Sequence, residues 1–217
     1  MQLNRAAIDV PLDRVEPWVR RWIRPALWAL AVLPLPGLVV MYYTGGLGAE
    51  PIEAAEKYTG EWVLRLLAGS LAVTPLMRLT EWGWLITQRR FLGLAAFYWA
   101  LGHLSVYIGL DKFFDVHDIV EDVLKHLYIT VGMLAVVLMV PLAITSTKGW
   151  IKRLGGKRWN MLHRLVYVSA IAGCIHYIWG QKKDIEEPLM YTAAFVVLFA
   201  LRLILPKRGR RRTVVSA

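Results

Sequence analysis

The sequence contains a single cysteine, Cys174, among its 217 residues. One thiol cannot build a disulfide framework, a multi-cysteine zinc site, a cysteine-ligated iron–sulfur cluster or the C-x-x-C-H attachment of c-type haem. Charged residues are also scarce at 19%, against about a quarter in soluble domains, whereas hydrophobic residues reach 57%. The apolar excess falls in long uncharged runs, which predicts an integral membrane protein and excludes a soluble enzyme or a disordered chain.

Six of these runs are long enough to cross about 30 Å of hydrocarbon as helices of about 20 residues. No segment alternates in the manner of the ~10-residue strands of membrane barrels. We therefore predict an all-α integral membrane fold, a six-transmembrane-helix bundle, in which prolines kink the spans and neighbouring helices satisfy the freed carbonyls. Residues 1–24 form a basic N-terminal arm, 25–205 the transmembrane domain and 206–217 a basic tail. The predicted spans are Pro25–Thr44, Glu61–Leu79, Phe91–Leu110, Leu127–Ser146, Leu162–Gly180 and Pro188–Leu205.

The positive charges are distributed unevenly among the connections between the spans. Twenty of the 26 Lys and Arg residues lie in the N-terminal arm, in Arg78–Arg90, in Lys148–Arg164 and in the tail from Arg202. Twelve of the 16 Asp and Glu residues lie in the other loops or their flanks. The positive-inside rule then predicts that both termini are cytoplasmic. Because topology accounts for the net charge of +10, we expect membrane lipid and no nucleic acid as a partner.

Three of the five histidines, His103, His163 and His176, lie inside predicted spans. Ionisable groups in a bilayer are costly, so they tend to face the bundle interior and to mark functional sites. The alternative for each is a neutral imidazole that is hydrogen-bonded to another helix. His103 lies 12 residues after Phe91, and His176 lies 14 residues after Leu162. At about 1.5 Å per residue, both histidines are roughly 20 Å from the cytoplasmic ends of two parallel spans.

Two histidines at one depth can supply both axial ligands of one haem iron. Neutral imidazole also suits zinc or copper, but such sites normally need about three or four ligands. The pattern therefore favours haem, with His103 and His176 as its ligands. His163 lies near the cytoplasmic end, where the residue at matching depth on the third span is Arg89, which stays protonated and is a very poor iron ligand. The sequence leaves open whether a second, inner haem is bound by His163, because no residue is identified as its sixth ligand.

The remaining histidines, His117 and His126, lie in the outer loop 111–126. Apolar residues recur there at intervals of three and four, which predicts an amphipathic helix lying flat on the outer surface rather than a ligand-bearing segment. Tyr107, Tyr167 and Tyr177 are candidates for hydrogen bonds to the haem ligands.

An ordered set of short motifs resembles the ferric-reductase-like transmembrane family over roughly residues 25–205. Within this family, the chain looks like the haem-binding membrane subunits of bacterial protein-methionine-sulfoxide reductase systems. The motifs are Gly60–Trp62, Thr74–Arg78, Arg89–Leu94, His103 with Tyr107, Thr145–Thr147, Leu154–Gly155, Lys157–Trp159, Leu162–His163, Tyr167 and His176–Tyr177.

The resemblance implies b-type haem, one or two per chain, bound by His103, His163 and His176, with Arg89 at the position of a fourth histidine in the wider superfamily. It also implies FMN and a location in the bacterial inner membrane. Electrons would pass from a cytoplasmic flavin reductase or the quinone pool to a periplasmic molybdopterin enzyme that reduces methionine sulfoxide.

Only Pro206–Ala217 follow the sixth span, and no Gly-rich nicotinamide motif fits there. We therefore expect a non-catalytic electron-transfer subunit that needs two partners. One alternative is a quinol-oxidising cytochrome b subunit of another complex, which would share the haem and differ in its partner. A second is a proton or metal-ion transporter with a histidine relay, against which we find no internal repeat and no mid-span carboxylate.

Overall fold

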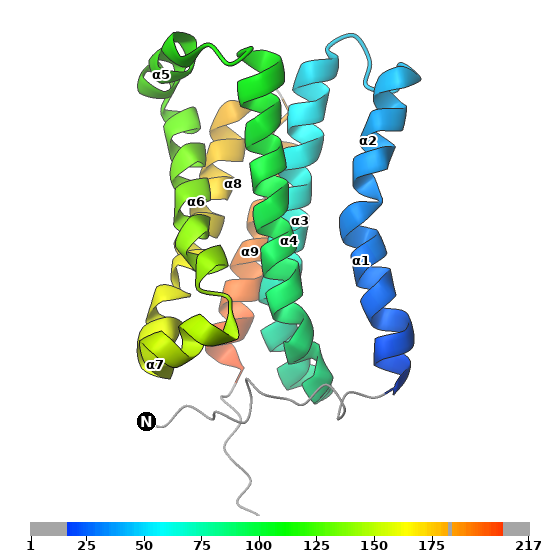
Figure 1. Ribbon diagram of the computed structural model, residues 1–217, viewed down its shortest axis with the longest axis vertical. Helices are drawn as coiled ribbons and strands as arrows, with labels where there is room; N and C mark the ends of the chain where they lie inside the picture. Colours follow the sequence, from blue (N-terminus) through cyan, green and yellow to red (C-terminus); the bar gives the residue numbers. More distant parts are fainter. Residues whose placement is uncertain (1–16, 182–183, 206–217) are drawn as a thin grey trace, which may run out of the picture.

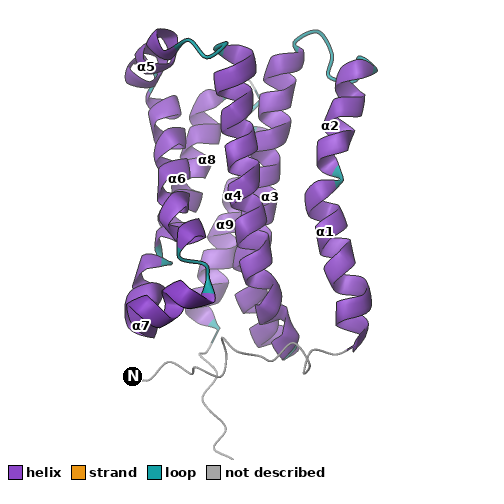
Figure 2. Ribbon diagram, viewed as in Figure 1, coloured by secondary structure: helices purple, strands orange, loops and turns teal. Residues whose placement is uncertain are grey.

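The computed structural model describes residues 17–181 and 184–205, and within these ranges the chain forms helices and no strand (Figure 2). Six helical segments are long and apolar enough to cross a membrane, which confirms the predicted all-α bundle. The predicted arm before residue 17 and the tail from residue 206 lie outside the described residues. The helices are α1 (Arg24–Val32), α2 (Pro34–Tyr43), α3 (Pro51–Thr80), α4 (Ile86–Val106), α5 (Val116–Lys125), α6 (Leu127–Ile144), α7 (Lys148–Leu162), α8 (Leu165–Gly180) and α9 (Glu186–Ile204), with π-helical turns at Val19–Ile23 and Tyr107–Asp111 and a 3₁₀ turn at Gly83–Leu85.

Helix α3 is the centre of the bundle. It packs along most of its length against α4 and also contacts α9, while α6 pairs with α8 (Figure 1). The core is formed where leucines of α3 meet small residues of its neighbours, because small side chains let membrane helices approach closely. This core includes Leu64, Leu67, Leu71, Ala96, Ala100, Ala170 and Cys174.

The second span begins ten residues earlier than the sequence predicts. Glu53, Glu56 and Lys57 lower the hydropathy of this segment, yet it continues α3, with Ala55 and Thr59 buried against its neighbours. The extension turns the predicted edge residue Glu61 into an interior residue of the membrane-spanning helix.

At Pro75 a neighbouring helix satisfies the carbonyl that the proline frees, as predicted. Pro75 lacks an N–H, so the carbonyl of Leu71, four residues earlier in α3, has no helical donor. The guanidinium of Arg202 in α9 supplies two N–H groups to that oxygen, at 3.2 Å from Nε and 2.6 Å from Nη2.

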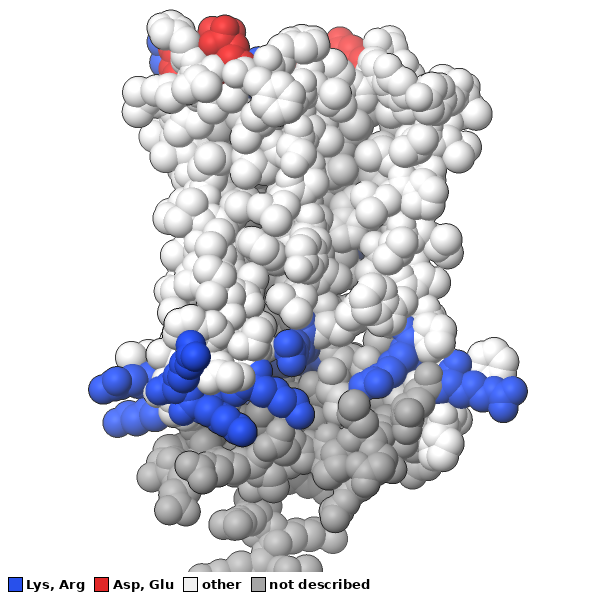
Figure 3. Space-filling model, in the orientation of Figure 1, with Lys and Arg blue, Asp and Glu red and all other residues white. Residues whose placement is uncertain are grey.

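The two ends of the bundle carry opposite charge. Lys and Arg gather at the end where α7 lies, and Asp and Glu gather at the end where α5 lies (Figure 3). We call these the basic end and the acidic end. The first residues of α1 and the last residues of α9 both lie at the basic end (Figure 1).

The contact between Arg202 and Leu71 predicts a specific double-mutant result. Arg202→Met should lower the stability of the bundle by about 1–3 kcal/mol, because it leaves a buried carbonyl unpaired. Pro75→Ala restores an N–H to that carbonyl, so Arg202→Met should cost much less in the Pro75→Ala background. Thermal unfolding in detergent measures both differences, with the exposed Arg90→Met as the control. Equal losses in the two backgrounds would contradict this account of the Leu71 carbonyl.

Candidate functional site

A cavity of about 1080 Å³ lies between α3, α4, α6 and α8 toward the acidic end. Its deep wall is apolar and includes Leu64, Leu67, Ala100 and Met139. Its size is at the upper end of the roughly 300–1000 Å³ typical of small-molecule and cofactor sites. The position of the cavity follows from the extended start of α3, which supplies one wall from Pro51 onward.

His103 of α4 and His176 of α8 both line this cavity. Their ring centroids are 6.1 Å apart and their ring planes are inclined at 74°. The structure therefore brings together the two histidines that the sequence predicts to lie at one depth. Metal–imidazole bonds are about 2 Å long, so two rings that ligate one metal ion have centroids about 6 Å apart. The separation in this structure fits two axial ligands of one metal.

Backbone carbonyls fix the tautomer of both rings. His103 Nδ1 lies 3.0 Å from the carbonyl oxygen of Glu56, and His176 Nδ1 lies 2.7 Å from the carbonyl oxygen of Tyr128. The Thr59 hydroxyl is also 3.2 Å from His103 Nδ1, but it donates its own proton to the Ala55 carbonyl at 2.8 Å. A carbonyl only accepts, so each Nδ1 carries the proton and donates it. Each Nε2 then holds a free lone pair, and within the described residues no group forms a hydrogen bond with it. An Nδ1–H donated to a backbone carbonyl is a common arrangement of metal-ligating histidines.

Two glycines allow the helices to approach these rings. A Cβ at Gly132 of α6 would lie only 2.6 Å from His176 Nδ1 and 2.9 Å from its Cε1. A Cβ at Gly60 of α3 would lie 3.3 Å from His103 Cε1. Each ring therefore packs directly on the backbone of a neighbouring helix, which orients the imidazole as well as setting its tautomer.

His163 lies elsewhere, in the turn between α7 and α8 at the basic end. Its Nε2 is 3.1 Å from the Thr145 hydroxyl, which donates its own proton to the Pro141 carbonyl at 2.6 Å. His163 Nε2 must therefore be the donor, and Nδ1 holds the lone pair, the reverse of the other two histidines. The ring stacks on Trp159 at a centroid distance of 3.8 Å.

The positive charge of the half-buried Arg89 lies near His163. Within the described residues, the Arg89 guanidinium has no hydrogen-bond or ion-pair partner. A cation held in this way beside an imidazole suits an anionic group, because each of its N–H donors is still available.

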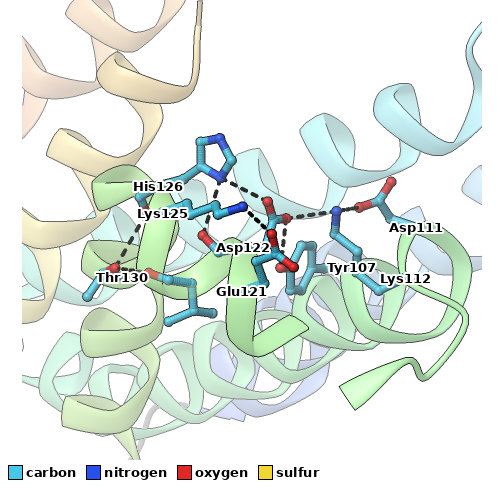
Figure 4. Close-up of polar contacts among 9 residues, drawn as sticks. Tyr107, Asp111, Lys112, Glu121, Asp122, Lys125, His126 and Thr130 are labelled. Carbon is cyan, nitrogen blue, oxygen red and sulfur yellow. Dashed lines mark hydrogen bonds and ion pairs between the residues drawn. The ribbon is translucent and has the colours of Figure 1, made fainter. Parts of the chain in front are cut away.

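The outer loop folds as an amphipathic helix, α5, and Asp122 fixes it to the rest of the acidic end (Figure 4). The Asp122 carboxylate accepts from Lys112 at 2.7 Å and from Tyr107 at 3.1 Å, and its other oxygen lies 2.8 Å from His126 Nδ1. Partial burial acts to raise the pKa of Asp122, but the hydrogen bonds from Lys112 and Tyr107 outweigh it and hold that pKa below its usual value. The same contact raises the pKa of Lys112. The cluster lies at the cavity mouth.

The predicted positions of the outer histidines agree with the structure, whereas the predicted hydrogen-bond partners of three tyrosines do not. His117 and His126 lie outside the cavity lining, as predicted. The three tyrosines that were candidates for hydrogen bonds to the histidines bond elsewhere. Tyr107 donates to Asp122 and Tyr177 donates to Glu61. The Tyr167 hydroxyl accepts a hydrogen bond from Arg202. The actual partners are carbonyls of Glu56 and Tyr128, which sequence cannot single out because every residue has a carbonyl. Gly60 and Gly132 are the features of the sequence that could have indicated where a helix backbone passes close to each ring.

The chain is similar to proteins of one known membrane family. The family model "Ferric reductase like transmembrane component" matches residues 59–174. A protein of Herminiimonas arsenicoxydans is 48% identical over 183 residues, which cover 83% of this chain and 84% of that protein. A protein of Rhodospirillum rubrum is 47% identical over 188 residues, covering 87% and 90%. A protein of Ralstonia nicotianae is 44% identical over 198 residues, covering 90% and 91%. All three are named protein-methionine-sulfoxide reductase heme-binding subunit MsrQ.

The close approach of Gly132 to His176 gives a direct test of the cavity geometry. Gly132→Ala should destabilise the chain by about 1–3 kcal/mol, because the added methyl group displaces the imidazole or separates α6 from α8. Gly102→Ala is the matched control, since a Cβ at Gly102 of α4 meets no atom within 4 Å. Alanine is the better helix former, so the control should be neutral or stabilising. Equal stability of the two variants, measured by thermal unfolding in detergent, would contradict the placement of His176.

Proposed function

The chain belongs to the ferric-reductase-like MsrQ family of haem-binding subunits, and we propose that it carries electrons through the membrane by means of a b-type haem bound between His103 and His176. The observation that carries this proposal is the pair of imidazoles whose centroids are 6.1 Å apart, with both Nδ1 atoms bonded to carbonyls and both Nε2 atoms open. The bound haem supplies a one-electron redox couple.

The residues of the chain supply what such a couple requires. The carbonyls of Glu56 and Tyr128 accept from the imidazoles and so increase their basicity as ligands. The apolar deep wall, with Leu64 and Met139, keeps water away from the space between the rings. Both effects act on the potential of a bound haem, because ligand basicity and burial are the levers that a protein has on it.

A second cofactor position is formed at the basic end by His163 and Arg89. The free lone pair on His163 Nδ1 can accept a metal or a proton donor, and the unpaired Arg89 guanidinium suits a carboxylate or a phosphate. A second haem and FMN both carry such anionic groups. The basic helix α7 lies at the same end and adds further cations for a flavin phosphate (Figure 3).

The charge asymmetry supports an orientation in the bacterial inner membrane with the basic end in the cytoplasm. Electrons then enter at the basic end from a flavin reductase or the quinone pool. They leave at the acidic end to a periplasmic molybdopterin-containing subunit that reduces methionine sulfoxide, and the chain itself has no catalytic role. An acidic surface around the exit favours a partner with a basic docking face.

The names of the relatives argue against the transporter alternative. The relatives are heme-binding subunits by name, and a transporter with a histidine relay would need no haem. The quinol-oxidising cytochrome b alternative differs only in its partner, and the relatives are subunits of protein-methionine-sulfoxide reductase by name.

Single substitutions of the histidines test the proposed ligand set. His103→Ala and His176→Ala should each abolish the low-spin b-type haem spectrum of the purified protein, because each removes one axial ligand. His126→Ala, outside the cavity lining, is the control and should leave the spectrum intact. His163→Ala should also leave the spectrum of the haem between His103 and His176 intact. Retention of the low-spin spectrum in both His103→Ala and His176→Ala would overturn the proposal.

A further inference from the structure

The cavity that contains His103 and His176 is divided by polarity along its length. Every Lys, Asp and Glu that lines it lies toward the acidic end, on the first turns of α3 or in the connections at that end, while the deeper lining is apolar. Haem has an apolar ring and two propionate carboxylates. Burying a carboxylate in an apolar wall without a partner is costly, so the carboxylates belong at the charged mouth of the cavity.

That mouth is unfavourable for carboxylates except at two positions. Its acidic lining residues outnumber its basic ones, and Lys57 and Lys112 are the only lysines or arginines in the described lining. The side chains of these lysines are 38% and 23% exposed, so each is partly withdrawn from water at the rim. The acidic lining residues are Glu50, Glu53, Glu56, Glu61, Asp111, Asp122 and Asp184.

Both lysines keep donors for a further carboxylate. An ammonium group has three N–H donors. Lys57 Nζ contacts one carboxylate within the described residues, that of Glu187 at 2.6 Å. Lys112 Nζ contacts two, those of Asp122 at 2.7 Å and Asp111 at 3.2 Å. Lys57 therefore has two donors left and Lys112 has one, and the existing contacts hold both ammonium groups at the rim.

We infer that Lys57 and Lys112 bind the two haem propionates at the mouth of the cavity and thereby orient the haem between His103 and His176. This inference rests on the proposed function, since it requires haem in this cavity. It makes the two lysines positioning residues: they act on how firmly and in which orientation the haem is held, and they do not ligate iron.

The test compares natural haem with its dimethyl ester, in which both propionates are uncharged. Full-length chain, produced without haem, is reconstituted with each form, and release of the haem to excess apomyoglobin is timed. Lys57→Gln and Lys112→Gln should each release natural haem roughly threefold to tenfold faster than the unmodified chain, as expected for a partly exposed charged pair. With the dimethyl ester, neither substitution should change the release rate further. Lys57→Arg should restore the rate for natural haem.

Lys125→Gln is the matched control, because Lys125 lies on α5 at the same end, pairs with Glu121 and does not line the cavity. It should release natural haem at the unmodified rate. Equal acceleration by Lys57→Gln or Lys112→Gln with both forms of haem would mean that the lysines only support the fold, and would overturn the inference. Unchanged release of natural haem from both variants would overturn it as well. Failure of the unmodified chain to bind natural haem would instead refute the proposed function, and the inference with it.

Discussion

The cost of leaving a polar group unpaired in hydrocarbon is the constraint on which the rest of this structure depends. No water is available inside a bilayer, so a freed carbonyl or a buried imidazole N–H without a partner is costly. Arg202 meets this need at the Leu71 carbonyl, which Pro75 leaves without a helical donor. The same requirement acts on His103 and His176, whose Nδ1–H groups bond to carbonyls of the helix opposite. The bonds that satisfy the histidines also make them suitable metal ligands.

The difference between the two sets of histidines follows from the identity of their partners. A carbonyl at Nδ1 leaves Nε2 open in His103 and His176, whereas a hydroxyl at Nε2 leaves Nδ1 open in His163. The first pair faces a large cavity at the acidic end, and His163 has Trp159 stacked on one face and the positive charge of Arg89 nearby. One bundle thus provides two chemically distinct positions near its opposite ends, which suits transfer of electrons along its axis.

Much of this arrangement could be predicted from the sequence, because in a membrane helix depth is proportional to residue number. The spacing of His103 and His176 from the starts of their spans was enough to predict that they meet. The start of α3 was placed ten residues late, since Glu53 and Lys57 resemble loop residues when the helix they extend is not known. The tyrosines were the wrong hydrogen-bond candidates because the true acceptors are backbone atoms, and only tertiary structure determines which carbonyl faces a given ring.

The measurement that tests the central claim most directly is a low-temperature electron paramagnetic resonance spectrum of the oxidised, detergent-purified protein, together with a pyridine-haem determination. Two imidazole ligands on one iron predict a low-spin ferric signal from at least one b-type haem per chain. A purely high-spin signal would mean that His103 and His176 do not both bind the iron. A colourless protein from cells supplied with ample haem would contradict the account entirely.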